Sequence, residues 1–439
     1  MPEPSFSLFF DAAWQIFKNW WWILPPFILW KPFMSLWIWW RFESWIEKQR
    51  WIVLEIKLPK EILKPIRAME TVMNSIHGVI YHPPDWWEKW VDGQIQLSIA
   101  FEITSIDGEP HFYIRTPVSY RAAVESSFYS QYPEVEIEEV DDYTKYVPQN
   151  IPNKDWDLWG SDYKTAKDDH YPIKTYLQFE TEHEPLEEKR VDPVASLLEA
   201  MAKIKQGEQL WIQIIATPLA KDKGTADLGD ATTIPWLKEG EALRDKLARR
   251  IEKPKEKPII QEAAEILITG KVGEEEKQQE IIPPEMKLTP GEREVITQVE
   301  AKMTKPIFET IIRFIYMGQR NVWFKPNFRL AFSFFTSYTT ANLNMLLPIS
   351  KTLTKIHKKL FLPINYLRPR RHYMRCRKLF RNYTHRVNHS FPRSGEVCML
   401  NTEEIASLFH FPGKAVAPAP GISRIEAKKG GVPPELPVE

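Results

Sequence analysis

Cysteine is nearly missing from this sequence of 439 residues, which contains only Cys376 and Cys398. Two cysteines offer no disulfide framework, which agrees with a reducing compartment. The loops GxxxxGK[ST] and GxGxxG are missing too, so the chain lacks the backbone donors and the lysine that cradle a nucleotide's phosphates. No HExxH, CxxC or GxSxG motif occurs. The sequence therefore predicts a protein that is not an enzyme, with no catalytic residue, no cofactor and no metal ion.

The chain also has no net charge, because its 58 lysines and arginines equal its 58 aspartates and glutamates in number. Their distribution is uneven: residues 310–395 contain no aspartate or glutamate but 17 lysines and arginines. Within 351–393 the basic residues are interleaved with aromatic ones, a combination that suits phosphate backbones and exposed bases. The predicted nucleic-acid-binding or partner-binding residues are Lys358, Lys359, Arg368, Arg370, Arg371, Arg375, Arg377, Lys378 and Arg381. The same basic residues would also suit anionic lipid headgroups or the acidic surface of a protein. A further alternative is that they bind nothing and form the solvated basic face of a helix.

Tryptophan, by contrast, is concentrated at one place: ten of the 18 lie between Trp14 and Trp51. Residues 19–40 contain one charge, Lys31. As a helix they would extend about 33 Å, enough to cross a bilayer core of about 30 Å. The sequence predicts an amphipathic lead-in at 1–18 and a transmembrane anchor at 19–41. The predicted membrane-contacting residues are Trp20, Trp21, Trp22, Trp30, Trp37, Trp39 and Trp40, since indole rings favour the membrane–water boundary.

The flanks of this segment predict its orientation. More basic residues follow it than precede it, so the expected location is the cell membrane, single-pass, with the bulk of the chain cytoplasmic. Pro25, Pro26 and Pro32 interrupt the apolar run, which makes an interfacial or re-entrant segment the alternative.

Residues 51–147 carry the pattern of a small α+β unit. Apolar alternation predicts strands at 51–58, 94–104, 112–115 and 134–138, and apolar spacings of three and four predict helices at 62–76 and 119–132. In the second strand the polar residues, Glu102 among them, alternate with apolar ones, which predicts a half-buried strand. Asp107-Gly108 predicts a hairpin turn and Ser119 a helix N-cap. The order βαββαβ is the ferredoxin-like, or split βαβ, arrangement.

A second α+β unit of similar type is expected at 155–350, interrupted by a charged insertion at 251–286. Its strands are predicted at 173–179, 210–216 and 308–316, and its helices at 192–206, 237–250, 289–303 (capped by Thr289) and 325–343. The stretch 150–170 is expected to be a loop. A basic helical region follows at 351–412, with a capping box at Asn401 and Glu404, and 413–439 is expected to be a Pro/Gly-rich tail. The predicted fold class is α+β: a transmembrane helix, two ferredoxin-like units, and a basic helical C-terminal region with an extended tail.

Several stretches resemble a known family. WIVLEIKLPKE and FYIRTPVSYRAAVESSFYSQYPEVEIEEVDDY, within 51–143, and the later RRHYMRCRKLFRNYTHR and CMLNTEEIASLFHFPG resemble the N-terminal, pre-motor region of type IV secretion and conjugation-like ATPases of the coupling-protein or helicase type. The resemblance implies a Trp-rich membrane segment, ferredoxin-like modules and a connector that leads into a P-loop motor. This sequence ends at 431–439, where the connector would enter the motor.

The resemblance therefore implies a non-catalytic, membrane-anchored accessory subunit that positions or regulates a partner P-loop ATPase in a DNA or protein transfer system. Its implied docking element consists of Asn401, Glu404, Phe409, Phe411 and Gly413. DNA and further copies of the chain are additional expected partners. The alternative is a membrane-tethered nucleic-acid-binding module that acts through residues 351–393.

Overall fold

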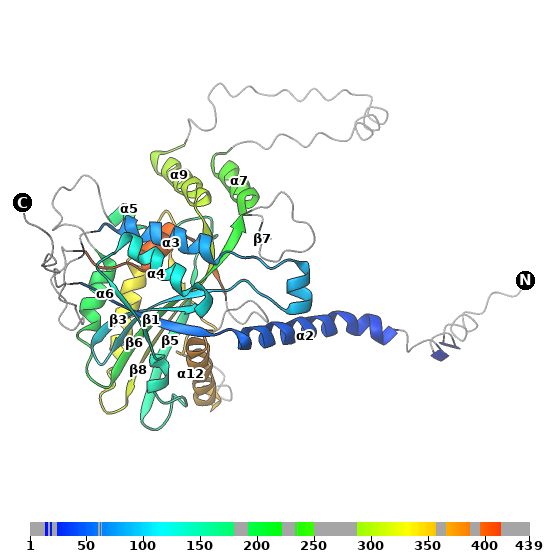
Figure 1. The fold of residues 1–439 in the computed structure, drawn as a ribbon, viewed down its shortest axis with the longest axis horizontal. Coiled ribbons are helices and arrows are strands. Elements are labelled where there is room, and N and C mark those ends of the chain that lie inside the picture. The colour runs from blue at the N-terminus through cyan, green and yellow to red at the C-terminus, as the bar shows by residue number, and fades with distance from the viewer. Residues whose placement is uncertain are drawn as a thin grey trace, which may run out of the picture.

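One antiparallel sheet forms the centre of the structure (Figure 1). This computed structural model describes residues 14–15, 18–19, 24–59, 62, 64–179, 192–221, 233–234, 236–249, 288–356, 366–386 and 396–413. The order of the strands along the sheet is β4-β1-β3-β2-β6-β8-β5-β9. Off this path, β10 pairs with β8 antiparallel, and the short β7 pairs with β6 in parallel.

The first half of the sheet is built from residues 51–140. Its elements in chain order are β1 (Trp51–Lys57), α3 (Ile66–Ile80), β2 (Ile99–Ile106), β3 (Glu109–Pro117), α4 (Arg121–Gln131) and β4 (Glu136–Val140). Asp107 and Gly108, with φ angles of 55° and 92°, make the tight turn between β2 and β3 that the Asp-Gly pair predicts. The strand order β4-β1-β3-β2 is that of a split βαβ unit.

The second half repeats this order as β9-β5-β8-β6. Its elements are β5 (Trp156–Thr165), α5 (Tyr176–Phe179), α6 (Pro193–Met201), β6 (Glu208–Lys221), β7 (Thr233–Ile234), α7 (Trp236–Leu247), α9 (Pro290–Thr304), β8 (Ile307–Gln319), α10 (Arg329–Thr336) and β9 (Leu346–Pro348). Thr289 accepts a hydrogen bond from the backbone N–H of Glu292 and caps α9, as its sequence predicts. The charged insertion 251–286 lies outside the described residues.

The two halves share one sheet, because β2 pairs with β6 from Ile99–Ala216 to Ile106–Gln209. The strand order of two ferredoxin-like units is present, but the two do not form separate sheets: each half contributes an edge strand, and their pairing removes two open edges. Two local predictions are also wrong. Residues 173–179 contain the helical turn α5 rather than a strand, and the expected loop 150–170 contains the strand β5.

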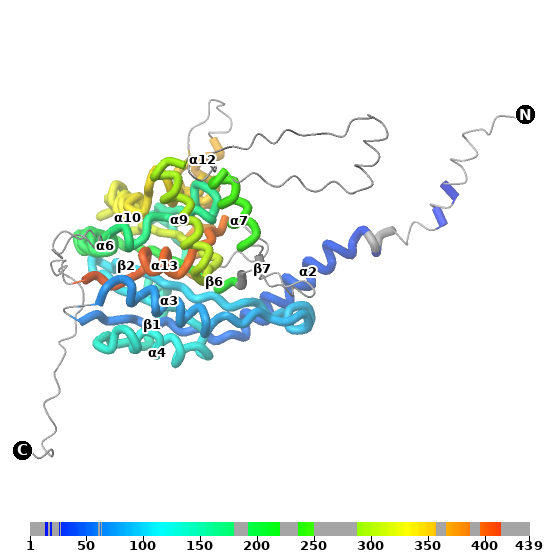
Figure 2. Tube along the Cα trace, turned by 90° about the horizontal axis from the view of Figure 1, so that it is seen from above, coloured from blue at the N-terminus to red at the C-terminus, as the bar shows by residue number. Residues whose placement is uncertain are grey.

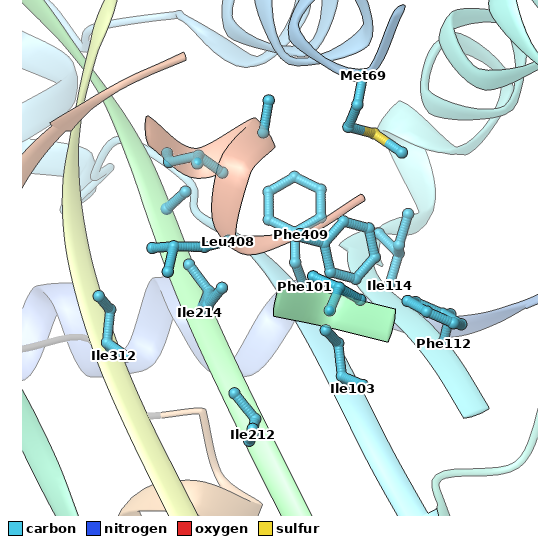
Figure 3. Close-up of a cluster of buried hydrophobic side chains, with 14 of the residues drawn as sticks. Met69, Phe101, Ile103, Phe112, Ile114, Ile212, Ile214, Ile312, Leu408 and Phe409 are labelled. Carbon is cyan, nitrogen blue, oxygen red and sulfur yellow. The ribbon is translucent and has the colours of Figure 1, made fainter. Parts of the chain in front are cut away.

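The two faces of the sheet are covered differently. On one face α3, α4, α6, α10 and α13 (Thr402–Leu408) enclose the main apolar core, part of which is drawn in Figure 3. The opposite face carries a smaller apolar cluster that packs against α12 (Arg368–Thr384). Figure 1 shows α12 on the side of the sheet away from α3 and α4. Alternate residues of one strand divide between the faces: in β8, Phe314 belongs to the main core and Ile315 to the smaller cluster.

The segment formed by β10 (Cys398–Asn401) and α13 is buried within the main core. The ring of Phe409 lies 5.1 Å from that of Phe101 and 5.7 Å from that of Phe112 (Figure 3). The predicted capping box of Asn401 and Glu404 is present. Phe409 and Phe411 are also buried, and Gly413 is half-buried. The chain thus uses the element expected to dock on a partner to complete its own core.

The N-terminal helix α2 (Leu24–Lys48) extends away from the sheet (Figure 2). Across the described residues, no helix is long and apolar enough to cross a membrane. The predicted transmembrane anchor and single-pass membrane location are therefore wrong. Tryptophan supplies much of the side-chain volume of this helix, and its indole N–H makes it less apolar than leucine or isoleucine. Lys31 also interrupts the apolar stretch of the helix. The residues Trp20, Trp21 and Trp22, and most of the lead-in 1–18, lie outside the described residues; Trp30, Trp37, Trp39 and Trp40 lie exposed on α2.

Candidate functional site

Helix α12 separates its apolar residues from its basic ones. Cys376, Leu379, Phe380 and Tyr383 are buried against the sheet, at the spacing of one helix face. The exposed basic residues of this helix are Arg368, Arg370, Arg371, Arg377, Lys378 and Arg381. These six side chains belong to the set predicted from the sequence, and we call them the basic face of α12.

The other predicted basic residues are placed differently. Arg375 is half-buried and donates to the backbone oxygens of Ser350, at 3.2 Å, and Leu353, at 2.9 Å, so its role is to hold the preceding loop. Lys358 and Lys359 lie outside the described residues.

Two hollows lie beside the basic face. The first, of about 710 Å³, is lined by Gln149, Tyr373, Met374, Arg375, Arg377, Lys378, Phe380, Arg381, Thr384 and His385. The second, of about 720 Å³, is lined by Asn150, Pro152, Asn153, Lys154, Asp157, Arg320, His372 and Tyr373. Tyr373 lines both, and its side chain is 47% exposed. The two hollows are therefore neighbours that share Tyr373 in their walls.

The electrostatics of this surface are dominated by cations. None of the lining residues of the first hollow, all in the described part of the chain, is acidic. In the second hollow Asp157 is paired with Arg320 at 3.1 Å. Burial, together with the nearby charges of Lys325, Arg368 and Arg320, lowers the pKa of His372 against the opposing effect of Asp157. His372 is thus neutral at physiological pH, and the positive charge belongs to the lysines and arginines.

A row of polar side chains crosses the sheet beneath α12. Glu102, Gln213, Arg313 and Asp162 are register partners on the four adjacent strands β2, β6, β8 and β5, and all four are completely buried. Gln213 Nε2 donates to Glu102 Oε1 at 2.6 Å, and Arg313 Nε lies 3.2 Å from Asp162 Oδ1. We call these four residues the polar row. Glu102 is therefore not on a half-exposed face, as the alternation predicts, because α12 covers that face.

The polar row holds the C-terminal end of α12. Gln213 Nε2 donates to the backbone oxygen of Tyr383 at 3.2 Å, and Arg313 donates to that of Asn382. These are carbonyl groups of the last helical turn, and that of Tyr383 also accepts a hydrogen bond from the backbone N–H of Arg386 at 3.0 Å. A guanidinium group at this end also complements the helix dipole. The row therefore fixes the position from which the basic face points outward.

Arg386, just beyond α12, completes this attachment. Its guanidinium donates to both oxygens of Glu102, at 3.0 and 3.1 Å, and to both oxygens of Asp142. Although burial opposes it, the charge of Glu102 and these hydrogen bonds raise the pKa of Arg386. Against the effect of burial, Arg386 also lowers the pKa of Asp142. Arg386 and Asp142 thus both stay ionised, although an unpaired charge at this buried position would be costly.

The sequence contained a signal for the polar row that alternation alone did not reveal. Glu102, Gln213 and Arg313 each stand inside a strongly apolar stretch, namely IAFEITS, LWIQIIA and TIIRFIY. A charged or polar residue in the middle of such a stretch is buried only when it is paired or hydrogen-bonded. Three such interruptions therefore predict a shared network, although not which strands are neighbours.

The described residues contain no group of three or more His, Cys, Asp or Glu side chains that could hold a metal ion. A family model with the description "Domain of unknown function (DUF8128)" matches residues 43–417. A search of curated proteins gave no match. The matched range includes both halves of the sheet, α12, and the buried segment β10–α13.

Proposed function

The chain belongs to this family of unknown function, and from the geometry of α12 we propose that it is a non-catalytic nucleic-acid-binding module. The observation that carries the proposal is the basic face of α12, which is exposed, lies beside two hollows, and is held in place by the buried polar row. An ordinary solvated helix face mixes both signs of charge, whereas residues 310–395 contain no acidic residue at all.

The arrangement of the basic face suits a repeating polyanion. Arg370, Arg377 and Arg381 follow one another at intervals of seven and four residues and so share one side of the helix. A helix of 17 residues is about 26 Å long, which is long enough to face several successive phosphates of a strand. Tyr373 lies between these arginines along the helix, and its ring supplies the aromatic contact that bases favour.

The resemblance to the pre-motor region of transfer ATPases stays a prediction, since the description of the matching family assigns no function. A nucleic-acid-binding module is compatible with an accessory role beside a P-loop ATPase in DNA transfer. The proposal does not depend on that partner, because it rests only on the surface of α12.

The test is the binding of a fluorescein-labelled 20-mer DNA or RNA to the full chain, followed by anisotropy at several salt concentrations. We expect the variant Arg377→Gln/Lys378→Gln/Arg381→Gln to lose about tenfold or more in affinity at ~0.1 M salt. The slope of log K against log salt should become less negative by about 2–3, since each lost phosphate contact contributes about 0.7–0.9.

The matched control is Lys203→Gln/Lys205→Gln/Arg293→Gln, which removes the same charge from exposed positions away from α12. This variant should bind as the original chain does. Equal losses in the two variants would reduce the effect to net charge and reject the site. The proposal also fails if neither nucleic acid binds, or if only anionic vesicles or an acidic protein bind to the basic face.

A further inference from the structure

We infer that the ligand is a single strand, one of whose unpaired bases stacks on Tyr373 between the two hollows. This inference rests on the proposed function and names the form of nucleic acid that the site takes. Three features carry it: the position of Tyr373, the concave walls on both sides of it, and the attachment of α12 to the sheet.

Tyr373 has the exposure and the neighbours of a stacking platform. Its side chain is 47% exposed although it lines both hollows, so part of the ring is open to a ligand. The guanidinium carbon of Arg377 lies 5.8 Å from the centre of the ring. With the guanidinium over one face of the ring, a base would stack on the other face while the arginine binds the adjoining phosphate.

The hollows have the size and lining for a flexible strand. Volumes of about 710 and 720 Å³ fall within the range of about 300–1,000 Å³ of small-molecule sites, so each has room for a nucleotide. Met374 and Phe380 give the first hollow apolar surface beside its cations. A strand that runs past Tyr373 would place bases against these surfaces and phosphates against Arg377, Lys378 and Arg381.

The wall of the second hollow is preformed. Asn153 Oδ1 accepts hydrogen bonds from the backbone N–H groups of Asp155, at 2.8 Å, and Trp156, at 2.7 Å. Arg320 Nε donates to the backbone oxygen of Asn153 at 3.1 Å. A strand therefore meets a wall that is already ordered, which lowers the entropic cost of binding.

A duplex fits this surface less well. A helix that reads duplex DNA protrudes far enough to enter a major groove about 12 Å wide. Here α12 lies along the sheet, and residues 149–154 form a second wall beside it. The bases of a duplex are stacked on each other, so Tyr373 would reach none of their faces.

The experiment compares three fluorescein-labelled probes on the full chain: a 15-mer of thymidine, the same 15-mer in a duplex, and a 15-mer with abasic sugars. The single strand should bind at least about tenfold more tightly than the duplex or the abasic strand. Tyr373→Ala should weaken the binding of the single strand by about tenfold and leave the other two probes unchanged. Tyr373→Phe, which keeps the ring, should bind as the original chain does.

The control is Tyr366→Ala, which removes an exposed ring that lines neither hollow. If the duplex binds as tightly as the single strand, or if Tyr373→Ala binds the single strand normally, the inference is overturned while the proposed function stands. If none of these probes and no RNA 20-mer binds the original chain, the proposed function itself fails. The same result for Tyr366→Ala and Tyr373→Ala would also reject a specific stacking site.

Discussion

Arg386 illustrates how single residues govern this surface. It is a non-glycine residue in the left-handed region, with φ 49°, and its side chain is almost completely buried. Such a conformation costs about 1–3 kcal/mol and persists only where the surroundings determine it strongly. Here the surroundings are Glu102 and Asp142, which bind the guanidinium on two sides. One buried arginine thus serves as the anchor of a helix whose basic face points outward.

We predict that Arg386→Ala lowers the free energy of unfolding by about 3–5 kcal/mol, because it leaves the buried carboxylate of Glu102 without its cation. Urea unfolding followed by circular dichroism would measure the change. Arg381→Ala is the matched control: it removes an exposed arginine from the same region of the chain, and its effect should stay within about 0.5 kcal/mol. Equal effects of the two variants would contradict the assignment of Arg386 as an anchor.

Among the elements, the helices α13 and α12 are both held to the rest of the fold by residues distant in the sequence, but they differ in how much of their surface is buried. The segment β10–α13 is buried almost throughout, and the buried pair Lys302–Glu404, at 2.9 Å, ties it to α9. Helix α12 buries one side and leaves the other open. A helix that is buried all round stabilises the core, whereas one with a charged open side is available for a ligand.

We predict that Phe409→Ala lowers the free energy of unfolding by about 3–5 kcal/mol, since it removes a completely buried ring packed against Phe101 and Phe112. Phe324→Ala provides the control because Phe324 is 56% exposed, and its effect should be small. Urea unfolding of both variants measures the difference. A loss below about 1 kcal/mol for Phe409→Ala would mean that the segment around α13 is not part of the core.

For the molecule as a whole, the pairing of β2 with β6 joins two split βαβ arrangements into one continuous sheet. The main core contains side chains from both halves, with Leu54 of β1 and Phe101 of β2 from the first and Ile212 of β6 and Phe314 of β8 from the second. A core shared in this way leaves neither half with a complete apolar interior of its own. The stability of each half therefore depends on the presence of the other.

We predict that both halves unfold together. Phe101→Ala, a change in β2, should lower the protection of backbone amides against hydrogen exchange by the same free energy in β1 and in β8. The measurement is native-state hydrogen exchange of the full chain, read by mass spectrometry. A loss of protection confined to β1, β2 and β3 would show that the halves are independent, as two separate units would be.

Features that depend on neighbouring residues could be predicted from the sequence. The strand β1, the Asp107-Gly108 turn and the capping boxes at Thr289 and Asn401 lie where local pattern predicts them, and the helix α3 begins four residues later than predicted. Local pattern failed at Ser119: α4 has Tyr120 as its N-cap, without a side-chain hydrogen bond. The sequence did predict the basic residues of α12, because charged residue types can be read directly from it.

Which of those basic residues are open to a ligand follows only from the tertiary structure. Arg375 and Arg377 look alike in the sequence, yet one is turned toward a loop and the other lies on the basic face. The burial of Glu102 depends on Arg386, and the burial of Asp162 in β5 depends on Arg313, both far away in the chain. A buried charge is stable only beside its counter-charge, and the fold alone brings the two together.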